Sequence, residues 1–232
     1  MEYPLGYTLL KPGGALLTKK LLSMGGEIEN QRVLELGCGR GETAALLAEE
    51  YGAAVTGADI SEALISECRK KYPGIPFVVA DAEALPFADG SFDILVCECC
   101  FSVFSDPRKA LREAYRVLSK DGILLLSDLW KHGKKSAGRG MVRNIYSRDT
   151  WEDMITGAGF LITGFTDARD ALTEMYIQMI MDQGIEAAQR QIGICLPPEE
   201  MKSVSYMLLA AKKEEQIIHF AGGKDSYSSE IA

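Results

Sequence analysis

Three alternating glycines that follow an acidic strand are the residues of this chain best suited to chemistry. Residues 33–36 are apolar apart from one acid, a composition that suits a buried parallel strand. Gly37, Gly39 and Gly41 follow, before a helix that we expect to begin near Glu42. Because glycine lets a backbone approach a ligand closely, this loop predicts a cofactor pocket at the end of the strand.

The residue three positions after Gly39 separates two classes of cofactor. The fingerprint for a dinucleotide requires glycine or alanine there, so that the helix packs on the strand beside the pyrophosphate. This chain has Glu42, whose carboxylate would face phosphate. A dinucleotide-dependent dehydrogenase is therefore disfavoured.

Two further strands also end in acids. Residues 54–59 form a short apolar run ending in Asp59, which lies 20 residues after Gly39, where ribose hydroxyls are usually held. Residues 77–82 form a third strand that contains Asp81. The carboxyl ends of parallel strands meet at one edge of a sheet, and this edge binds ligands. Solvation alone does not require an acid at each of the three strand ends.

The pattern of strands and helices continues to about residue 130. Residues 92–97 predict a fourth strand. Asp106-Pro107 predicts the start of a helix that runs to Leu118, because proline suits a first helical turn. A turn at residues 120–122 leads into a fifth strand at 123–127, and we expect another helix at 149–158 and a strand at 160–165. Residues 204–211 predict a closing antiparallel strand.

Across residues 30 to 130 the sequence resembles the class I S-adenosylmethionine (SAM)-dependent methyltransferases, including ubiquinone and menaquinone C-methyltransferases. The resemblance implies a doubly wound, Rossmann-like α/β fold with a seven-stranded sheet, mostly parallel with an antiparallel last strand. It also implies SAM as cofactor and S-adenosylhomocysteine as product, with Asp81 beside the adenine and the N-terminal region folded over the cofactor. The expected cofactor-binding residues are Tyr7, Lys11, Glu35, Gly37, Cys38, Gly39, Gly41, Asp59, Ile60, Asp81, Ala82 and Cys97.

Methyl transfer requires mainly alignment of the acceptor and exclusion of water, because the sulfonium already makes the methyl group electrophilic. Where the acceptor must lose a proton, the candidates are the polar residues beyond the fourth and fifth strands: Glu98, Asp128 and His132. Glu98 is the preferred base. Two other roles for Glu98 stay open, namely holding the amino group of the cofactor and capping a helix.

Cys97, Cys99 and Cys100 raise an alternative, because thiolates bind soft metals and metalloids. Residues 110–118 and 127–128 are similar to arsenite methyltransferases, but equally to the quinone C-methyltransferases. Strand alternation predicts Cys97 and Cys99 on one side and Cys100 on the other, an arrangement that suits three converging ligands poorly. We therefore expect buried packing residues and no metal site.

A single domain is expected over residues 1–213. It comprises an N-terminal cap at 1–30, the cofactor-binding core at 31–130, a basic loop at 131–148 that is either a solvated loop or a lid for an anionic substrate, and a helical insertion at 168–200; a polar tail follows at 214–232. In the insertion, Leu172, Met175, Tyr176, Met179 and Ile180 share one helical face. Three roles for this face stay open: packing on the sheet, covering a substrate pocket, and contact with a second subunit in a homodimer.

Composition excludes several classes of function. The 232 residues carry a net charge of −8, which disfavours nonspecific binding to nucleic acid. No apolar run is long enough to span a membrane, and we expect a soluble, cytoplasmic protein. The sequence therefore predicts methylation of a small-molecule acceptor, with a catalytically silent SAM-binding protein as an alternative. The identity of the acceptor and the atom that is methylated are not encoded in these motifs.

Overall fold

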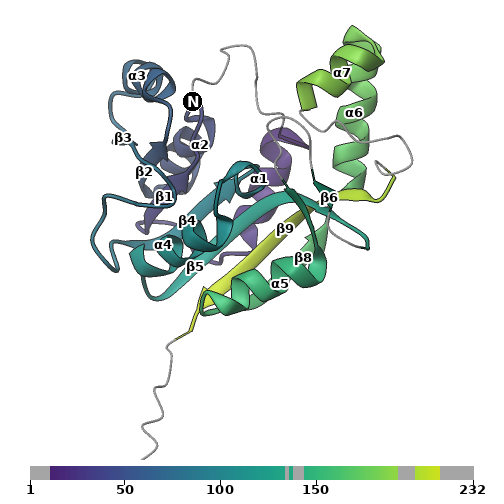
Figure 1. Cartoon of the computed structure of the whole chain (residues 1–232). Coiled ribbons are helices and arrows are strands. Elements are labelled where there is room, and N and C mark those ends of the chain that lie inside the picture. Colours follow the sequence, from purple (N-terminus) through teal and green to yellow (C-terminus); the bar gives the residue numbers. More distant parts are fainter. Residues whose placement is uncertain (1–10, 134–135, 138–143, 193–201, 215–232) are drawn as a thin grey trace, which may run out of the picture.

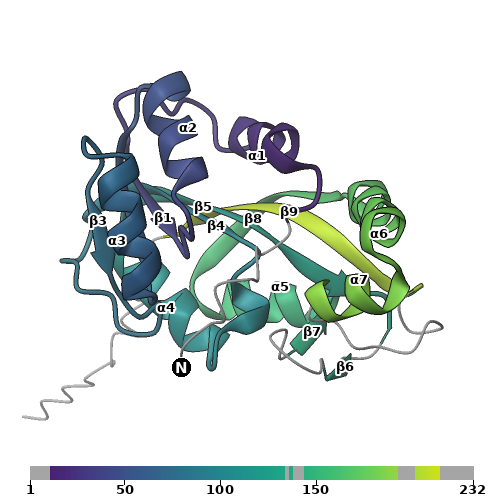
Figure 2. The ribbon, with the colours of Figure 1, turned by 90° about the horizontal axis from the view of Figure 1, so that it is seen from above.

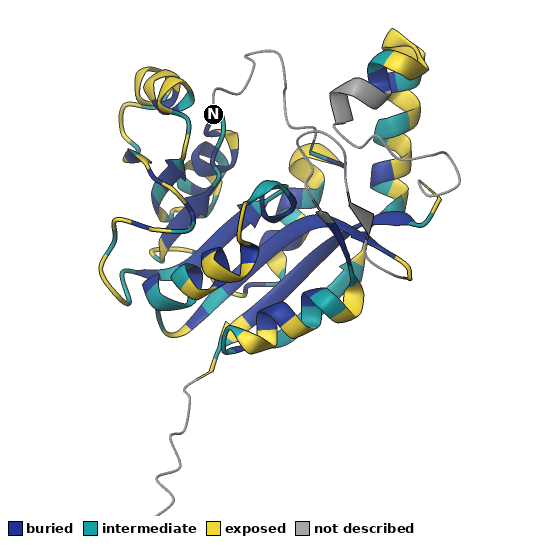
Figure 3. Ribbon diagram, viewed as in Figure 1, coloured by how far each residue is buried: buried dark blue, intermediate teal, exposed yellow. Residues whose placement is uncertain are grey.

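The computed structural model describes residues 11–133, 136–137, 144–192 and 202–214, and the structural statements below concern these residues. Helices lie on both faces of a central sheet (Figure 1). The strands in the middle of the sheet form the buried layer of the molecule (Figure 3). This arrangement confirms the doubly wound α/β fold that the family resemblance implies.

Five strands form the parallel part of the sheet in the order β3-β2-β1-β4-β5. Their bounds are β1 (Arg32–Leu36), β2 (Ala54–Asp59), β3 (Phe77–Val79), β4 (Phe92–Glu98) and β5 (Leu118–Lys131). The antiparallel β9 (Val204–Lys213) pairs with β5 and with β8 (Phe160–Asp167), as the sequence predicts. The strand order reverses between β1 and β4, and in open α/β sheets ligands bind at this switch point, beyond the carboxyl ends of the strands.

Two buried clusters of apolar side chains lie on opposite faces of the sheet. One cluster packs α1 (Gly14–Ser23), α2 (Glu42–Tyr51), α3 (Glu62–Lys71) and α6 (Arg169–Gln183) on the sheet. The other packs α4 (Pro107–Val117) and α5 (Arg148–Gly157) on the opposite face. Figure 2 shows α1 and α2 above the sheet and α5 below it. No helix in the described ranges is both long and apolar enough to cross a membrane.

Local signals fix the start of two helices. The side chain of Asp106 accepts a hydrogen bond from the backbone N–H of Lys109 at 3.0 Å, and Pro107 occupies the first turn of α4. Ser61 caps α3 in the same way through the N–H of Leu64. These caps satisfy backbone donors that a helix start otherwise leaves free.

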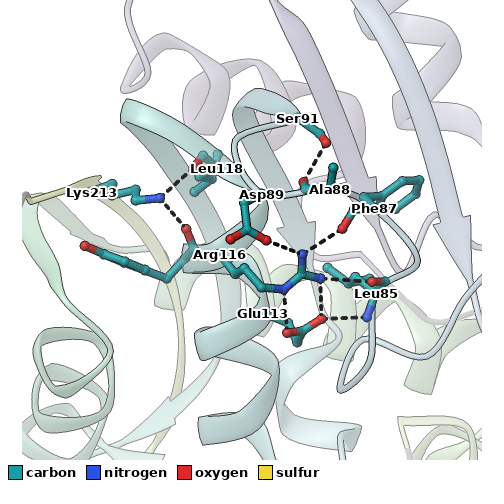
Figure 4. Close-up of polar contacts among 10 residues, drawn as sticks. Leu85, Phe87, Ala88, Asp89, Ser91, Glu113, Arg116, Leu118 and Lys213 are labelled. Atoms are coloured by element: carbon teal, nitrogen blue, oxygen red, sulfur yellow. Dashed lines mark hydrogen bonds and ion pairs between the residues drawn. The ribbon is translucent and has the colours of Figure 1, made fainter.

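Arg116 fixes the segment 85–91 between β3 and β4 (Figure 4). Its guanidinium donates hydrogen bonds to the carbonyl oxygens of Leu85 at 2.9 Å and Phe87 at 2.7 Å. The same guanidinium pairs with Glu113, one turn earlier on α4, at 2.7 Å. The segment is thus held against α4, which keeps the end of β3 and the start of β4 in a fixed relation.

Two strands differ in length from the prediction by three residues or more. β5 continues to Lys131, beyond the expected end at Ser127, because β9 pairs with it from Ile123↔Lys212 to Lys131↔Val204. β3 ends at Val79 rather than at 82, and Asp81 then lies in an isolated bridge to Ala84.

The expected basic loop contains two short strands in its described part. β6 (Ser136–Ala137) pairs antiparallel with β7 (Asn144–Ser147), and β7 pairs with the end of β5. The sheet therefore has nine strands in the described ranges instead of the expected seven. The expected cationic residues Lys134, Lys135, Arg139 and Arg143 lie outside the residues that are described.

The insertion before β9 is helical, as expected. α6 is followed by α7 (Ile185–Ile192), and both stand at the end of the sheet where β5 finishes and β9 begins (Figure 1). On the expected face of α6, Leu172 and Met179 are buried, whereas Ile177 and Met181 point away from the core and are 52% and 76% exposed. Packing on the sheet therefore accounts for one face of α6.

Candidate cofactor site and reacting edge

The glycine loop joins β1 to α2 at the switch point of the sheet. Gly37 and Gly39 have φ angles of 73° and 51°, which L side chains rarely adopt. A Cβ atom on Gly37 would lie 2.3 Å from the sulfur of Cys100, so the close approach of the segment that follows β4 requires glycine there. A Cβ atom on Gly39 would meet no atom of the described residues within 4 Å. Gly39 thus borders open space, where a ligand can approach its backbone.

Asp59 braces this loop. One of its carboxylate oxygens accepts a hydrogen bond from the N–H of Gly39 at 2.9 Å, and the other accepts from the N–H of Ser61 at 2.9 Å. Cys68 of α3 donates its S–H to the carbonyl oxygen of Gly39. Each oxygen of a carboxylate accepts more than one hydrogen bond. Asp59 therefore has capacity left for a pair of hydroxyl groups beside Gly39.

Glu35 is a buried carboxyl with an unused oxygen. Its residue is 7% exposed, one oxygen accepts from the N–H of Ala44, and Oε2 has no hydrogen-bond partner among the described residues. Burial, reinforced by the negative charge of Glu98, raises the pKa of Glu35 to about 8, although Lys11 opposes the shift. Such a carboxyl is suited to receive a cation.

Glu98 ends β4 and is held from three directions. It forms an ion pair with Lys11, which precedes α1. It accepts hydrogen bonds from the hydroxyl of Thr18 on α1 at 3.2 Å and from that of Thr43 on α2 at 3.1 Å. Lys11 also donates to Thr43 at 2.8 Å. The structure thus brings together Glu98 and Lys11 from the expected site, while the two threonines were not predicted.

The expected adenosine-binding residues follow β2 and β3. Ile60 is 55% exposed, and Val79, at the end of the neighbouring strand, is 40% exposed. Asp81 is exposed and accepts from the N–H of Glu83, whereas Ala82 is buried. Val79 was not predicted as a site residue. Its position could have indicated a role, because β3 pairs with β2 and Val79 is the register partner of Asp59 at the strand ends.

The other two candidate bases lie apart from the Glu98 contacts. Asp128 is fully buried and accepts from the N–H groups of Ser102, in the short helix η1 (Phe101–Val103), and Leu129 at 2.8 and 2.6 Å. Burial raises the pKa of Asp128 to about 6 despite these hydrogen bonds. His132 is exposed, with its ring 4.4 Å from the ring of Trp130. Tyr7 lies outside the described residues.

The predicted alternation of the three neighbouring cysteines is wrong. Cys97 and Cys100 both pack in the apolar cluster on the face of α4 and α5, whereas Cys99 packs against the opposite cluster and contacts the hydroxyl of Tyr206 at 2.8 Å. The reason is the backbone: β4 ends at Glu98, and Cys99 has a φ of 59°, so strand alternation no longer applies. Within the part of the chain that is described, no three His, Cys, Asp or Glu side chains form a group that could hold a metal ion.

Comparisons with known proteins agree with this geometry. Residues 34–126 match the family described as "Methyltransferase domain". A demethylmenaquinone methyltransferase of Thermus thermophilus is 32% identical over 184 residues, which cover 77% of each chain. A protein of Haemophilus influenzae described as uncharacterized is 28% identical over 93% of this chain and 92% of its own length. The structure of a geranyl diphosphate C-methyltransferase from Streptomyces coelicolor, in complex with Mg²⁺, geranyl diphosphate and S-adenosyl-L-homocysteine, matches with a TM-score of 0.72 at 16% identity, covering 86% of this chain and 79% of that chain.

The fold and the strand-end residues therefore define a Rossmann-like methyltransferase. The chain belongs to the class I SAM-dependent methyltransferases, and SAM is its cofactor. The described residues fit that cofactor: Gly39 leaves room for a ligand, and Glu35 presents a buried oxygen that has no partner in this part of the chain.

Proposed function

We propose that this methyltransferase acts on a small molecule bound beside the carboxyl ends of β4 and β5. The observation that carries the proposal is the position of the α6–α7 insertion. It leaves the sheet at the carboxyl end of β8 and returns at the start of β9, so it stands at the reacting edge (Figure 1). A helical cover at this edge favours a small acceptor over a macromolecule. The names of two relatives, a demethylmenaquinone and a geranyl diphosphate methyltransferase, describe small acceptors as well.

SAM, when bound, supplies an electrophilic methyl group on its sulfonium. We assign Asp59 to its ribose hydroxyls, Ile60 and Val79 to the faces of its adenine, and Asp81 to the exocyclic amine. The bound cofactor would lie along the loop residues Gly37, Cys38, Gly39 and Gly41. The site would be packed from the core by Ala82 and Cys97. These residues orient the cofactor, and positioning supplies most of what methyl transfer needs.

Which residue removes a proton from the acceptor is a separate question. Glu98 already interacts with a lysine and two hydroxyls, and these partners favour binding of a cation over general-base catalysis. Both carboxyl oxygens of Asp128 accept hydrogen bonds from backbone N–H groups. His132 is exposed at the end of β5 and is the candidate base that we favour where the acceptor must lose a proton. An anionic acceptor, a homodimer and a cytoplasmic location also stay predictions.

The test uses SAM carrying an isotopically labelled methyl group, incubated with a cell extract and the protein. The extract is then separated into small molecules, protein and nucleic acid. We expect label in the small-molecule fraction, and none with the Gly39→Val variant. Label in protein or nucleic acid contradicts the proposal, and absence of transfer with retained SAM affinity identifies a silent SAM-binding protein.

Methylation of a metalloid is the second candidate, favoured only by the neighbouring cysteines. Cys99→Ser combined with Cys100→Ser should leave SAM affinity and methylation of an organic acceptor largely intact, because neither thiol takes part in the sulfonium chemistry. The measurement is arsenite uptake by elemental mass spectrometry, which we expect to be absent in the unmutated protein. Stoichiometric uptake that is lost in the double variant would replace the organic acceptor with a metalloid.

A further inference from the structure

The chain turns where β4 ends, in a backbone conformation that its neighbours must enforce. Cys99 has a φ of 59°, a left-handed value that a residue with a side chain adopts only when surrounding contacts hold it there. The short helix η1 begins two residues later, at Phe101. Residues 99–103 are therefore the first segment beyond β4, at the edge of the sheet where we place the acceptor. The contacts that hold this turn bear on how the acceptor is aligned.

Two consecutive residues of β5 hold the turn. The carbonyl oxygen of Ser127 accepts from the N–H of Cys99 at 2.7 Å. Tyr206 of β9 bridges the same two residues, because its hydroxyl contacts the sulfur of Cys99 and donates to the hydroxyl oxygen of Ser127, both at 2.8 Å. Asp128 then accepts from the N–H of Ser102 at 2.8 Å. Since successive side chains of a strand point to opposite faces, β5 fixes the turn from both faces of the sheet.

Asp128 is the charged member of these contacts. It is fully buried, and Ser102 is 3% exposed. Its second oxygen accepts from the N–H of Leu129 at 2.6 Å. Charge-assisted hydrogen bonds of this kind are stronger than neutral ones, and removal of the carboxylate leaves buried N–H donors without a partner. Loss of Asp128 therefore loosens the turn first.

The groups around Asp128 stay neutral where Asp128 titrates. Burial raises its pKa to about 6. The titratable groups that interact with it are the thiols of Cys97, Cys99 and Cys100 and the hydroxyl of Tyr146 in β7. Burial raises the pKa of Cys97, Cys99 and Tyr146, and the neighbouring thiol of Cys97 together with burial raises that of Cys100. Among these groups, Asp128 alone changes charge near pH 6.

We propose that Asp128 is a positioning residue for methyl transfer, which holds η1 and the turn before it against the carboxyl end of β5. The turn forms a fixed wall beside the acceptor, and alignment of the acceptor is the main requirement of methyl transfer. Asp128 moves no proton in this role, because both of its oxygens already accept hydrogen bonds. The inference rests on the acceptor site of the proposed function and deepens it.

The test measures the turn and the reaction separately in Asp128→Asn, which keeps one acceptor oxygen, and Asp128→Ala, which keeps none. Asp93→Asn is the matched control: Asp93 also accepts from a backbone N–H, that of Arg32 at 3.1 Å, but near the opposite end of β4. Hydrogen exchange with mass spectrometry follows the peptide of residues 99–105, and calorimetry measures the affinity for S-adenosylhomocysteine. Transfer from labelled SAM is measured over a dilution series of the small-molecule fraction of a cell extract. Thermal melting checks folding.

We expect exchange of the peptide to become about 10-fold faster in Asp128→Ala and less so in Asp128→Asn, with affinity for S-adenosylhomocysteine changed by less than about twofold. The plateau rate of transfer should fall in the same order, about 100-fold and about 10-fold, because misalignment lowers the rate even when the acceptor is saturating. Asp93→Asn should change neither exchange of the peptide nor transfer.

A second measurement needs no variant that unfolds. In the unmutated chain, protection of the peptide, corrected for intrinsic exchange, should be lower at about pH 5 than at about pH 7.5, because a neutral Asp128 accepts more weakly, and Asp128→Asn should show no such change. Equal losses of transfer in both Asp128 variants with unchanged exchange would identify a base and overturn the positioning role. Unchanged transfer in both overturns it and leaves the acceptor proposal intact. If the unmutated chain labels no small molecule, the proposed function fails, and the positioning role fails with it.

Discussion

Two glycines of the cofactor loop are required for different physical reasons. Gly37 is required by its neighbour, because a Cβ atom would collide with Cys100, which lies two residues beyond the end of the adjoining strand β4. Among the described residues, Gly39 has no neighbour within 4 Å of a Cβ atom built on it, so packing by these residues does not explain it. We propose that a ligand occupies this space. The two positions can therefore be separated by substitution.

Gly39→Val should abolish SAM binding in a folded protein. A β-branched side chain would fill the space next to the loop, and it resists the φ of 51° at this position. Gly26→Val is the matched control, because Gly26 also has a positive φ, 77°, and open space, but lies away from the loop. Calorimetry should detect binding to the control alone. Full affinity in Gly39→Val would contradict the cofactor site.

Asp59→Ala should weaken SAM by about 1.5–3 kcal/mol, the usual cost of losing a charged hydrogen bond. The structure adds a second cause to the expected loss of ribose contacts, since Asp59 also holds the N–H of Gly39. Asp59→Asn keeps one acceptor oxygen and should lose less. Calorimetry gives both affinities, and an unchanged affinity in Asp59→Ala would remove Asp59 from the site.

At the scale of residues, the sequence predicts the candidate site residues that lie at the ends of strands. It misses the residues that tertiary packing brings to the same place. Glu35, Asp59 and the glycines lie at strand ends that pattern alone reveals. Thr18 and Thr43 reach Glu98 across 80 and 55 residues of chain, and no local pattern marks them. The side that Cys99 faces depends on a single left-handed φ, which strand periodicity cannot predict.

At the scale of elements, the order of strands and helices was predictable because caps and apolar runs are local. Asp106 and Pro107 mark the start of α4 with no help from distant residues. The length of β5 was not predictable, because its last residues are held by β9, whose partner residues follow some 70 to 90 positions later. The β6–β7 pair was missed for another reason, since strands of two and four residues are too short to show a pattern.

The two faces of α6 should respond differently to truncation. Leu172 is 6% exposed against the sheet, so Leu172→Ala should cost about 2–5 kcal/mol through lost burial and a cavity. Ile177 is 52% exposed, so Ile177→Ala should change stability by less than about 0.5 kcal/mol. Urea unfolding measures both. A large loss at Ile177 would show that the outer face is covered in solution, as a homodimer requires.

At the scale of the whole molecule, buried carboxyl groups lie near the edge of the sheet where the parallel strands end. Glu35 and Asp128 lie in the interior at the carboxyl ends of β1 and β5, and burial raises the pKa of both. Elsewhere the paired acids are more exposed, and the pKa of Asp93 is lowered to about 2 by Arg32. The cofactor edge is thus the part of the fold where neutral carboxyls are held ready for a cation, at the expense of stability when they ionise.

The stability of the chain should therefore fall as pH rises between about 6.5 and 8. The pKa of Glu35 rises on folding from 4.5 to about 8, so the folded state binds more protons than the unfolded state in this range. The free energy of unfolding then decreases with pH by at most about 1.4 kcal/mol per unit for this one group. Asp128, with a pKa of about 6, has mostly ionised before this window.

Urea unfolding at several pH values should give this slope, Glu35→Gln should remove it, and Asp93→Asn should keep it. Saturating S-adenosylhomocysteine should also reduce it, because an ammonium beside Glu35 favours the ionised carboxyl. An unchanged slope in Glu35→Gln would mean that Glu35 is already ionised in the folded protein.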